Sequence, residues 1–481
     1  MARFLRFLIL LIPIIALFAI YTPAHSFIHH QYDDSYITYR YAINLAQGHG
    51  LVFNVGERTD AASSFLYALV LSCCWLLHLR DLELAGGVIG VLSLAFISII
   101  VYKLAVYISS DKKAALLVAV ACGLNGLLAG WTLSGMETLP WAALVLLAIY
   151  LMVIDANPAA ITLAIAAAAF TRFEGIFLVV PYVILVVTTR SKSNKRLLPM
   201  GGVILAFALF YIVKHAYYGV WISHAFQMKE VAVYYRPAPR ELIHFWIRFV
   251  TVPLLLSAPA LLSRKYWFVL AYIGLSIASI ALGPRSDWSR YSVHLLPLLY
   301  AFSAPILAWM LANYRSRARV AALALVLFAM FAQALAAERV NWRNMSDLAE
   351  AQICRKNLGR YINTNIDKSE YIASSDLGAI AYVAIDHRFV DLIALTSADV
   401  LGRYRAGETA DEVLEAKHVK YIADTYASST SMSRLDVLLE EFPGVKRKSK
   451  FTINSDHPAF VCRPNGDFEF ILTKIVLKNN Q

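Results

Sequence analysis

Charged residues are scarce in this chain of 481 residues, because Asp, Glu, Lys and Arg make up only 16% of it. Hydrophobic residues make up 59%, and the mean hydropathy is +0.57. Soluble globular domains carry about 25% charged residues and about 45–50% apolar ones. The composition therefore excludes an ordinary soluble domain and predicts a protein that crosses a membrane several times.

Signatures of several enzyme classes are also missing from the sequence. There is no Gly-x-Ser-x-Gly motif for a hydroxyl nucleophile and no glycine-rich phosphate loop of the Walker type. Internal repeats and low-complexity stretches are absent as well. Hydrolysis by a serine nucleophile on such a motif and nucleotide hydrolysis on a Walker loop are therefore not expected.

The net formal charge of +11 is carried by the membrane part of the chain. From Glu338 onward there are 19 basic and 20 acidic residues, which leaves 25 basic and 13 acidic residues before it. Excess positive charge in the loops of a membrane protein lies on the cytoplasmic side. The charge therefore indicates topology and does not predict a nucleic-acid partner.

Eleven apolar segments are predicted to cross the membrane. The first, residues 7–21, follows Arg3 and Arg6, which favours a cytoplasmic N-terminus. A cleaved signal peptide is the alternative for this segment, since Thr22-Pro23-Ala24 would serve as a cleavage region. The other ten predicted spans are residues 84–107, 114–131, 139–154, 158–170, 175–187, 198–213, 242–262, 266–282, 291–311 and 320–337.

Residues 63–79 decide the topology, because they are apolar and precede the basic loops. If they cross the membrane, the basic clusters fall outside; if they form an interfacial or re-entrant helix, the clusters share the cytoplasmic side with the N-terminus. We predict the second arrangement, with the C-terminus outside. A second interfacial helix is predicted over residues 35–46, where Ile37, Tyr41 and Leu45 recur at helical spacing.

Two domains are predicted, a membrane domain over residues 1–337 and a soluble α/β domain over residues 338–481. In the second domain the pattern predicts helices over 348–362 and 411–416, and strands over 371–374, 389–392 and 419–423. Its two cysteines, Cys354 and Cys462, would lie in an oxidising compartment, where a disulfide is favoured. The sequence leaves their pairing open, because it gives no distance between them.

Asp33 and Asp34 stand side by side after the first apolar segment. Charge near hydrocarbon is poorly solvated, so carboxylates at a membrane surface indicate a functional site. One of them would act as general base on an incoming hydroxyl, and repulsion between adjacent carboxylates raises the pKa of one of the pair. The alternative is that Asp34 only caps the following helix. His29 and His30 beside the two acids form only a weak metal signature.

Several short motifs in the predicted outer loops resemble one superfamily of membrane enzymes. The longest reads Asp-Asp-Ser-Tyr-Ile-Thr-Tyr-Arg-Tyr-Ala over residues 33–42, and residues 48–54 and 56–58 continue it. The shorter ones are residues 134–138, residues 171–175, Asp287-Trp288, Arg290-Tyr291 and, in the tail, Asp376, Gly378, Tyr382 and Asp391. The chain resembles the GT-C superfamily of polytopic glycosyltransferases over residues 33–396. It is most similar to the family of the mycobacterial terminal arabinofuranosyltransferase and its uncharacterised bacterial relatives.

The resemblance implies a polytopic α-helical fold of about eleven transmembrane helices with periplasmic interfacial helices, in the bacterial inner membrane. It implies transfer of a sugar from a polyprenyl-phosphate donor to a hydroxyl of an envelope glycan or glycolipid outside the cytoplasm. Asp33 would be the general base, with Asp34 orienting it or sharing its task. The residues implied in binding the donor phosphate and the substrate are Arg58, Arg172, His224, Lys229, Asp287 and Arg290, with Arg285 as a further cation.

Simpler explanations exist for some of these residues. Each basic residue would also suit a contact with lipid headgroups at the interface. Glu137 and Glu174 begin predicted helices, where the helix dipole accounts for an acidic residue. Some GT-C enzymes use a divalent cation, so the resemblance leaves metal dependence open.

Two departures from the family leave the sugar open. Residues 224–229 read His-Ala-Phe-Gln-Met-Lys where relatives carry Pro-Asn-Thr-Phe-Tyr-Ala-Lys, and only Ser289 separates Trp288 from Arg290. Arabinose is therefore not carried over as the donor sugar. Two other classes compete with an enzyme. A transporter of lipid-linked glycans or solutes would carry polar residues at mid-span and paired repeats; the other class is a non-catalytic glycan-binding subunit.

Overall fold

The computed structural model describes residues 29–188, 196–231, 239–282, 288–313, 316–427, 451–453, 460–462 and 468–477. The chain divides into two compact units. Unit 1 contains Gly86–Phe210 and Pro237–Met345, and unit 2 contains His29–Ala85, Tyr211–Arg236 and Ser346–Gln481. The boundary predicted after residue 337 lies close in sequence to Ser346, where the last segment of unit 2 begins. Unit 2 also includes two segments from the first half of the chain.

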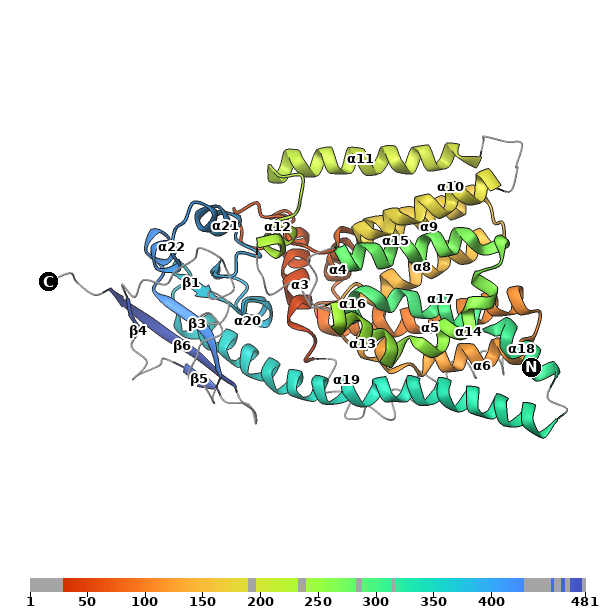
Figure 1. Cartoon of the computed structure of the whole chain (residues 1–481). Helices are drawn as coiled ribbons and strands as arrows, with labels where there is room; N and C mark the ends of the chain where they lie inside the picture. Colours follow the sequence, from red (N-terminus) through yellow and green to blue (C-terminus); the bar gives the residue numbers. More distant parts are fainter. Residues whose placement is uncertain are drawn as a thin grey trace. The chain divides into compact units, whose positions relative to one another are not determined.

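Unit 1 is built from helices (Figure 1). They are most of α5 (Leu82–Ser109), α6 (Lys112–Gly123), α7 (Gly126–Thr132), α8 (Thr138–Val153), α9 (Pro158–Thr171), α10 (Val179–Thr188), most of α11 (Leu198–Tyr218), α13 (Pro239–Phe249), α14 (Thr251–Leu261), α15 (Trp267–Leu282), α16 (Trp288–Ser292), α17 (Leu296–Phe302), α18 (Ala304–Ala312) and the first part of α19 (Arg317–Asn365). Short 3-10 turns join several of them, including η1 (Phe173–Leu178) between α9 and α10.

Four helical stretches of the described chain are long and apolar enough to cross a membrane. These are Leu82–Ser109, Leu198–Tyr218, Arg264–Leu282 and Arg290–Ala312. The pair α6 and α7 makes a fifth candidate with a bend of 54°. The other apolar helices are shorter, and the first predicted span, residues 7–21, lies outside the described residues. A polytopic helical membrane fold is thus confirmed, although helix length alone does not support every predicted span.

The bend between α6 and α7 is stabilised by Asn125. Its side chain accepts hydrogen bonds from the Leu127 and Leu128 N–H groups at 3.0 and 3.3 Å and donates one of 3.2 Å to the Tyr300 hydroxyl. Backbone groups inside a membrane need a protein partner, because no water is available there. The broken span therefore keeps the first N–H groups of α7 satisfied.

The span predicted over residues 242–262 is divided in the structure. Helix α13 ends at Phe249 and α14 begins at Thr251, with Val250 between them at φ −122° and ψ −22°. Pro253 lies in the first turn of α14. Proline is tolerated there because the N–H groups of the first turn make no hydrogen bond within the helix. The prediction missed this division because residues 242–262 are mostly apolar. Pro253 was the available signal, since proline favours the first turn of a helix.

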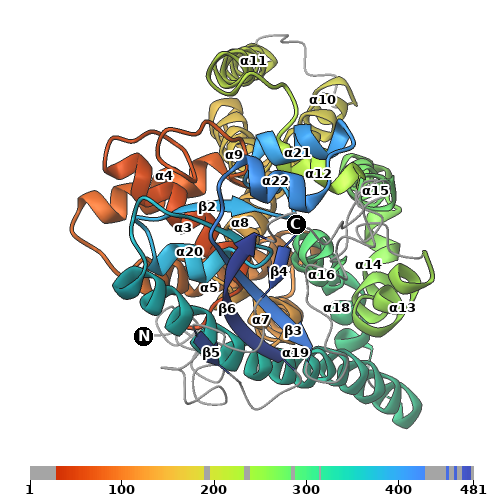
Figure 2. The ribbon, with the colours of Figure 1, turned by 90° about the vertical axis from the view of Figure 1, so that its left-hand side faces the viewer.

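Unit 2 contains a mixed sheet with helices on both faces (Figure 2). Its strands are β1 (Tyr371–Ser374), β2 (Arg388–Asp391), β3 (Tyr421–Ala427), β4 (Phe451–Ile453), β5 (Phe460–Cys462) and β6 (Phe468–Leu477). The order is β2-β1-β3-β6-β4, with β5 also paired to β6. Strand β1 runs parallel to β2 and β3, and β6 runs antiparallel to β3, β4 and β5. The predicted strands and helices of the tail are therefore present, joined by strands that were not predicted.

Alternate side chains of the sheet enter two separate cores, as the period of a strand requires. Ile372 and Phe389 pack with residues of α19, α20 (Gly378–Val383) and α3 (Asp33–Ala46). Ala373 and Val390, one position further on, pack with α21 (Ala398–Arg405) and α22 (Ala410–Ala416). Residues from the N-terminal part of the chain thus belong to the core of the α/β unit.

Helix α3 is enclosed by protein along most of its length. All residues from Ser35 to Asn44 are buried, and the helix packs against α4 (Phe65–Leu76) and α20 (Figure 1). The helix forms where it was predicted, but protein surrounds every face and not only the stripe of Ile37, Tyr41 and Leu45. Helix α4, predicted as interfacial or re-entrant, has 12 residues, whereas a span needs about 20.

Arg40 ties α3 to the rest of unit 2 through all five of its N–H donors. Their acceptors are the carbonyls of Phe53, Ala381, Ala384 and His387 and the side-chain oxygen of Asn54. Burial lowers the pKa of Arg40 to about 9, so the guanidinium stays charged at neutral pH. Among the described residues no carboxylate lies within 4.0 Å of it.

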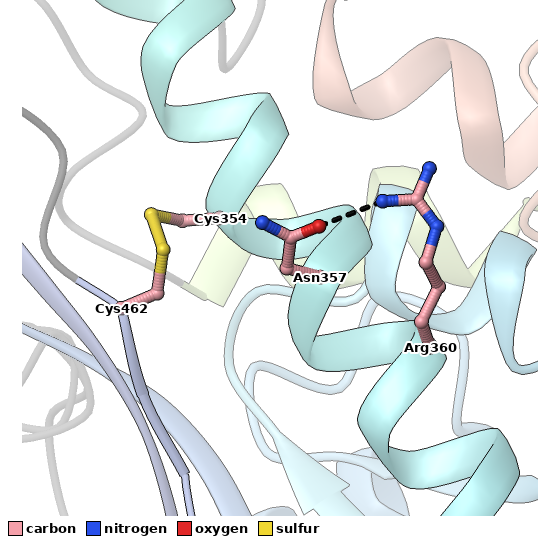
Figure 3. Close-up of a disulfide and its surroundings, with 4 residues drawn as sticks. All are labelled: Cys354, Asn357, Arg360 and Cys462. Carbon is pink, nitrogen blue, oxygen red and sulfur yellow. Dashed lines mark hydrogen bonds between the residues drawn. A yellow bond between two sulfur atoms is a disulfide. The ribbon is translucent and has the colours of Figure 1, made fainter.

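A disulfide joins α19 to β5 (Figure 3). Cys354 and Cys462 have a Cα–Cα distance of 5.5 Å, within the range for a bridge. Asn357 and Arg360 follow Cys354 on the same helix, and Arg360 donates a hydrogen bond of 2.7 Å to the Asn357 side chain. The cysteine pair that the sequence left open is thus bonded in this structure.

Replacing both Cys354 and Cys462 by serine is expected to lower the free energy of unfolding by about 2–4 kcal/mol, because the bridge closes a long loop. The two cysteines are 108 residues apart in the chain. Denaturation of the detergent-purified protein, with and without reductant, measures this loss. Serine at the free cysteines Cys73 and Cys74 is the control and should change little. Two free thiols at 354 and 462 in mass spectra of the unreduced protein would contradict the assignment.

Candidate active site

Asp33 lies in the first turn of α3, and its carboxylate reaches the N-terminus of α20. Its Oδ2 accepts a hydrogen bond from the Gly378 N–H and its Oδ1 one from the Ala379 N–H, both at 2.9 Å. The first N–H groups of a helix lack partners inside the helix, and the helix dipole favours an anion there. Asp33 therefore holds α3 and α20 together.

Two side chains of α19 complete the surroundings of Asp33. Gln352 donates a hydrogen bond of 3.3 Å to its Oδ1, and Arg355 Nε lies 3.7 Å from the same oxygen. Arg355 Nε also donates to Asp376 at 2.7 Å. Burial raises the pKa of Asp33; the Arg355 guanidinium opposes this effect, and the Asp376 carboxylate reinforces it. The cluster thus combines two carboxylates and one guanidinium in a largely buried position.

Asp34, in contrast, is exposed. The N-cap of α3 is Tyr32, whose side chain makes no capping hydrogen bond. Asp34 is the second residue of α3 and therefore is not its N-cap residue. Both oxygens of Asp33 already accept hydrogen bonds from the protein. Asp34 is the more exposed of the two acids, because the Asp33 side chain is only 20% exposed.

Gly378 permits the close approach of Asp33. A Cβ at this position would lie 2.1 Å from the Asp33 carbonyl oxygen and 2.4 Å from its Cγ. We expect Gly378→Ala to separate α3 from α20 and to lower the melting temperature. The added Cβ would clash with Asp33, and neither α3 nor α20 can move away without losing its packing. Gly402→Ala in α21 is the matched control: nothing lies within 4 Å of its Cβ, and alanine favours a helix by up to about 1 kcal/mol. A Gly378→Ala protein as stable as Gly402→Ala would contradict this contact.

A buried ion pair of Glu83 and Lys356 forms a second polar cluster in unit 2. Lys356 Nζ lies 2.6 Å from Glu83 Oε2, which also accepts a hydrogen bond of 3.3 Å from the Tyr36 hydroxyl. His29 Nδ1 lies 3.7 Å from the same oxygen and 3.8 Å from Asp81 Oδ2. His29 thus faces acids other than those the sequence suggested. A cavity of 480 Å³ is lined by His29, Asp81, Glu83 and Lys356 together with Tyr382.

His224 is buried and bonded to the loop after the first motif. Its backbone N–H donates to the Asp60 carbonyl at 2.9 Å, and its side-chain Nδ1 accepts a hydrogen bond of 3.2 Å from the Asp60 N–H. Burial lowers the pKa of His224, and Arg405 and Lys214 add to this, while the Asp60 carboxylate opposes it. His224 is therefore a neutral imidazole at pH 7 whose remaining proton is on Nε2.

The two cations near this loop, Lys214 and Arg58, have different partners. Lys214 Nζ pairs with Asp60 Oδ2 at 2.7 Å. Arg58 is exposed, with its guanidinium carbon 4.7 Å from the centre of the Tyr217 ring. Two other predicted residues cannot be described: Asp287, like Arg285, lies outside the described residues, and so does the side chain of Lys229, which belongs to α12 (His224–Val231).

In unit 1 the structure brings together Arg172 and Arg290, which the sequence predicted as phosphate ligands. Arg172 Nη1 lies 2.8 Å and Arg290 Nη2 lies 3.2 Å from the same oxygen of Glu137. Arg172 Nη2 also lies 3.2 Å from Glu174 Oε1. Glu137, Arg172 and Arg290 are buried. Two guanidiniums and two carboxylates thus form one network with no net formal charge.

Glu137 is the centre of this network, a role that sequence reasoning missed. It is the N-cap of α8 but makes no capping hydrogen bond, so the helix dipole alone does not explain it. Burial raises its pKa, but Arg290 and Arg172 outweigh burial and hold the pKa below its usual value. Glu137 is therefore an ionised buried carboxylate. The sequence offered one hint, because Glu137, Arg172 and Arg290 each belong to one of the short motifs in the predicted outer loops.

Metal binding is left open by the structure. Within the ranges described above, no group of three or more His, Cys, Asp or Glu side chains is arranged to hold a metal ion.

Comparison with known proteins identifies the fold. Residues 341–463 match a domain of unknown function (DUF8728). No curated protein matches the sequence. The chain is similar to the crystal structure of ArnT from Cupriavidus metallidurans bound to undecaprenyl phosphate, with a TM-score of 0.62 and 12% identity over 97% of each chain. The apo state of that protein gives a TM-score of 0.52 and 12% identity over 96% of this chain and 97% of that chain.

The likeness extends over the whole chain, so it concerns the complete fold. This chain shares the fold of that structure, which confirms the predicted GT-C fold class. The narrower resemblance to the arabinofuranosyltransferase family gains no support from these structures.

Proposed function

We propose that this chain is a glycosyltransferase of the bacterial inner membrane that takes its sugar from a polyprenyl-phosphate donor. The observation that carries the proposal is the likeness to ArnT in its complex with undecaprenyl phosphate, over 97% of both chains. A fold can host unrelated functions, so the residues of the site must also fit the chemistry. The acceptor is a hydroxyl of an envelope glycan or glycolipid.

The reaction needs a base for the acceptor hydroxyl and a stabilised phosphate as leaving group. The hydroxyl oxygen forms a bond with the anomeric carbon, its proton passes to a carboxylate, and the bond from that carbon to the phosphate oxygen breaks. Asp34 is exposed and suits the role of proton acceptor. Asp33, bonded to α20, suits a positioning role that fixes the first turn of α3. The geometry thus favours Asp34 over Asp33 as the base.

The residues predicted to bind the donor phosphate also differ in exposure. Arg58 is exposed and would be available to a phosphate, for which its planar fork is well suited. Neutral His224 can donate only through Nε2. Arg172 and Arg290 are engaged by Glu137, so we assign them a supporting role in unit 1. Lys229 and Asp287 remain candidates from the sequence alone.

The proposal includes an orientation, with the acids and the C-terminal domain outside the cytoplasm. Reporter fusions at Lys112 and Lys195 are expected to report the cytoplasm, and a fusion at Ser346 the outer side, because basic loops stay inside. An alkaline phosphatase signal at Lys112 or Lys195, or none at Ser346, would reverse the orientation.

Deletion of the gene tests the function directly. We expect the deletion strain to lose one sugar residue from an envelope glycan or glycolipid and to accumulate a polyprenyl-phosphate-linked sugar. Composition analysis of envelope fractions and mass spectrometry of extracted lipids measure both effects. The intact gene should reverse them. An unchanged envelope together with an unchanged lipid pool would reject the proposal.

A further inference from the structure

Helix α13 exposes two different rows of side chains, one basic and one aliphatic. Arg240, His244 and Arg248 recur every fourth residue, so they follow one side of the helix, and all three are exposed. Ile243 and Ile247 recur at the same spacing on the adjoining side and are 57% and 62% exposed. We call these two sets the basic row and the isoleucine row. The contacts of α13 with α14 and α16 leave both rows exposed (Figure 1).

The basic row does not suit a helix that crosses the membrane. Arg248 falls within the span predicted over residues 242–262 and is exposed. An exposed charge in the hydrocarbon core is costly, because nothing there solvates it. Helix α14, in contrast, contains no charged residue, and only Val250 separates it from α13. The polar surface of the membrane therefore lies close to the end of α13, and α14 continues into the apolar region.

Gln333 of α19 holds the division between α13 and α14. The Val252 N–H donates to Gln333 Oε1 at 3.1 Å, and Gln333 Nε2 donates to the Arg248 carbonyl at 3.0 Å. In an unbroken helix the Val252 N–H would donate to the Arg248 carbonyl directly, and a side chain inserted between such a pair is one cause of a kink. The bridge keeps both backbone groups bonded, as the membrane requires. Helix α13 can therefore take a direction of its own without leaving these groups unsatisfied.

The two rows together match the surface of a bilayer that contains anionic lipid. In a helix that lies in this surface, aliphatic side chains enter the boundary of the acyl chains and basic side chains meet the headgroups. The sequence of α13 contains two arginines and a single acid, Glu241, so the helix favours an anionic surface. A soluble protein is a poorer fit, because the adjoining α14 also exposes an apolar side chain, Leu255, which would have to be covered as well.

We propose that α13 lies in the plane of the membrane surface and binds anionic phospholipids. The isoleucine row then contacts the acyl chains, and Arg240 and Arg248 contact the phosphate groups of the lipids. Both rows are exposed on the surface of the helix, which suits exchange with many lipid molecules and not the selection of one donor. The inference goes beyond the proposed function, because it holds whether or not the chain transfers a sugar.

Spin labels on the full chain in lipid nanodiscs test the position of α13. A single label is attached at Ile243→Cys or Ile247→Cys after the three free cysteines are replaced by serine, which keeps the disulfide. Gly402→Cys on α21 is the control, because this position is exposed and nothing lies within 4 Å of its Cβ. We expect the ratio of collisions with oxygen to collisions with a water-soluble nickel chelate to be at least threefold higher on α13. Equal ratios at all positions, or labels on α13 shielded from both reagents, would overturn the proposal.

Native mass spectrometry of the full chain measures the preference for anionic lipid. With equal amounts of phosphatidylglycerol and phosphatidylcholine, we expect the double variant Arg240→Gln, Arg248→Gln to lower the ratio of the first bound lipid to the second at least threefold. Lys368→Gln with Lys420→Gln is the matched control, since it removes two positive charges from side chains that are 63% and 58% exposed. An equal fall of the ratio in both double variants would refute a lipid site on α13.

Undecaprenyl phosphate distinguishes bulk lipid from a sugar donor as the occupant of the basic row. We expect the double variant Arg240→Gln, Arg248→Gln to bind undecaprenyl phosphate within twofold of the unaltered chain. A loss of tenfold or more would make the basic row a donor site and overturn the proposal. If neither protein binds undecaprenyl phosphate, the donor in the proposed function is wrong, and bulk lipid is supported as the occupant of the basic row.

Discussion

Asp34→Asn is expected to reduce sugar transfer by about 10²–10⁴-fold, the usual contribution of a general base. Asparagine has nearly the same shape but cannot take the proton of the acceptor hydroxyl. Asp34 is exposed and is not the N-cap residue of α3, so the variant should fold and insert normally. Complementation of the deletion strain, followed by envelope sugar analysis, measures the loss; the amount of protein in membranes is measured alongside.

Asp33→Asn provides the contrast for this experiment. The amide cannot accept the two N–H groups of α20 as an anion does, and bonds to charged groups are worth about 1.5–3 kcal/mol. We therefore expect Asp33→Asn to lower stability, with any loss of transfer following from the displaced first turn of α3. The roles would have to be exchanged if Asp33→Asn were folded and stable but transferred no sugar, while Asp34→Asn remained fully active. Asp33 would then be the base.

Glu137→Gln is expected to destabilise unit 1 by about 3–5 kcal/mol, the cost of breaking a buried ion pair by removing one partner. The substitution leaves Arg172 and Arg290 buried beside a neutral amide, with Glu174 as the only acid of the network. Thermal unfolding in detergent, followed by intrinsic fluorescence, measures the effect. Expression should fall as well, because a loss of this size approaches the total stability of many proteins.

Asp155→Asn is the control for Glu137→Gln. Asp155 pairs with Arg196 at 2.7 Å, but its side chain is 58% exposed. Exposed ion pairs contribute about 0–1 kcal/mol, so this variant should unfold close to the unaltered protein. If both variants unfold alike, the Glu137 network does not hold unit 1 together.

Local patterns predicted the elements of the chain well. Strand β1 has the predicted bounds, and the helix α22 and the strand β2 lie within one residue of prediction. Strand β3 begins two residues later and ends four residues later than predicted. Apolar helices occur at the predicted spans that fall in the described residues, apart from the break between α6 and α7 and the division at Val250. Hydrophobic periodicity carries this information, because burial of one face or of a whole helix is a property of neighbouring residues.

The partners of the predicted site residues were not predictable in the same way. Gln352 and Asp33 are 319 residues apart, and nothing in the local sequence links them. The same holds for Glu137 and Arg290, which are 153 residues apart. A carboxylate in a motif indicates chemistry, but whether it is bonded, exposed or paired depends on residues that only the fold brings near. For this reason the sequence favoured Asp33 as the base, whereas the greater exposure of Asp34 leads us to propose Asp34.

The bond between Asp33 and Gly378 has a consequence for how the protein is made. The two residues are 345 positions apart, so at about 5–20 residues per second the ribosome needs roughly 17–70 s between them. During that time the buried helix that begins with Asp33 has none of its late partners. A nascent chain stalled before Gly378 should thus leave this helix open to proteases, and a chaperone would have to shield it until synthesis is complete.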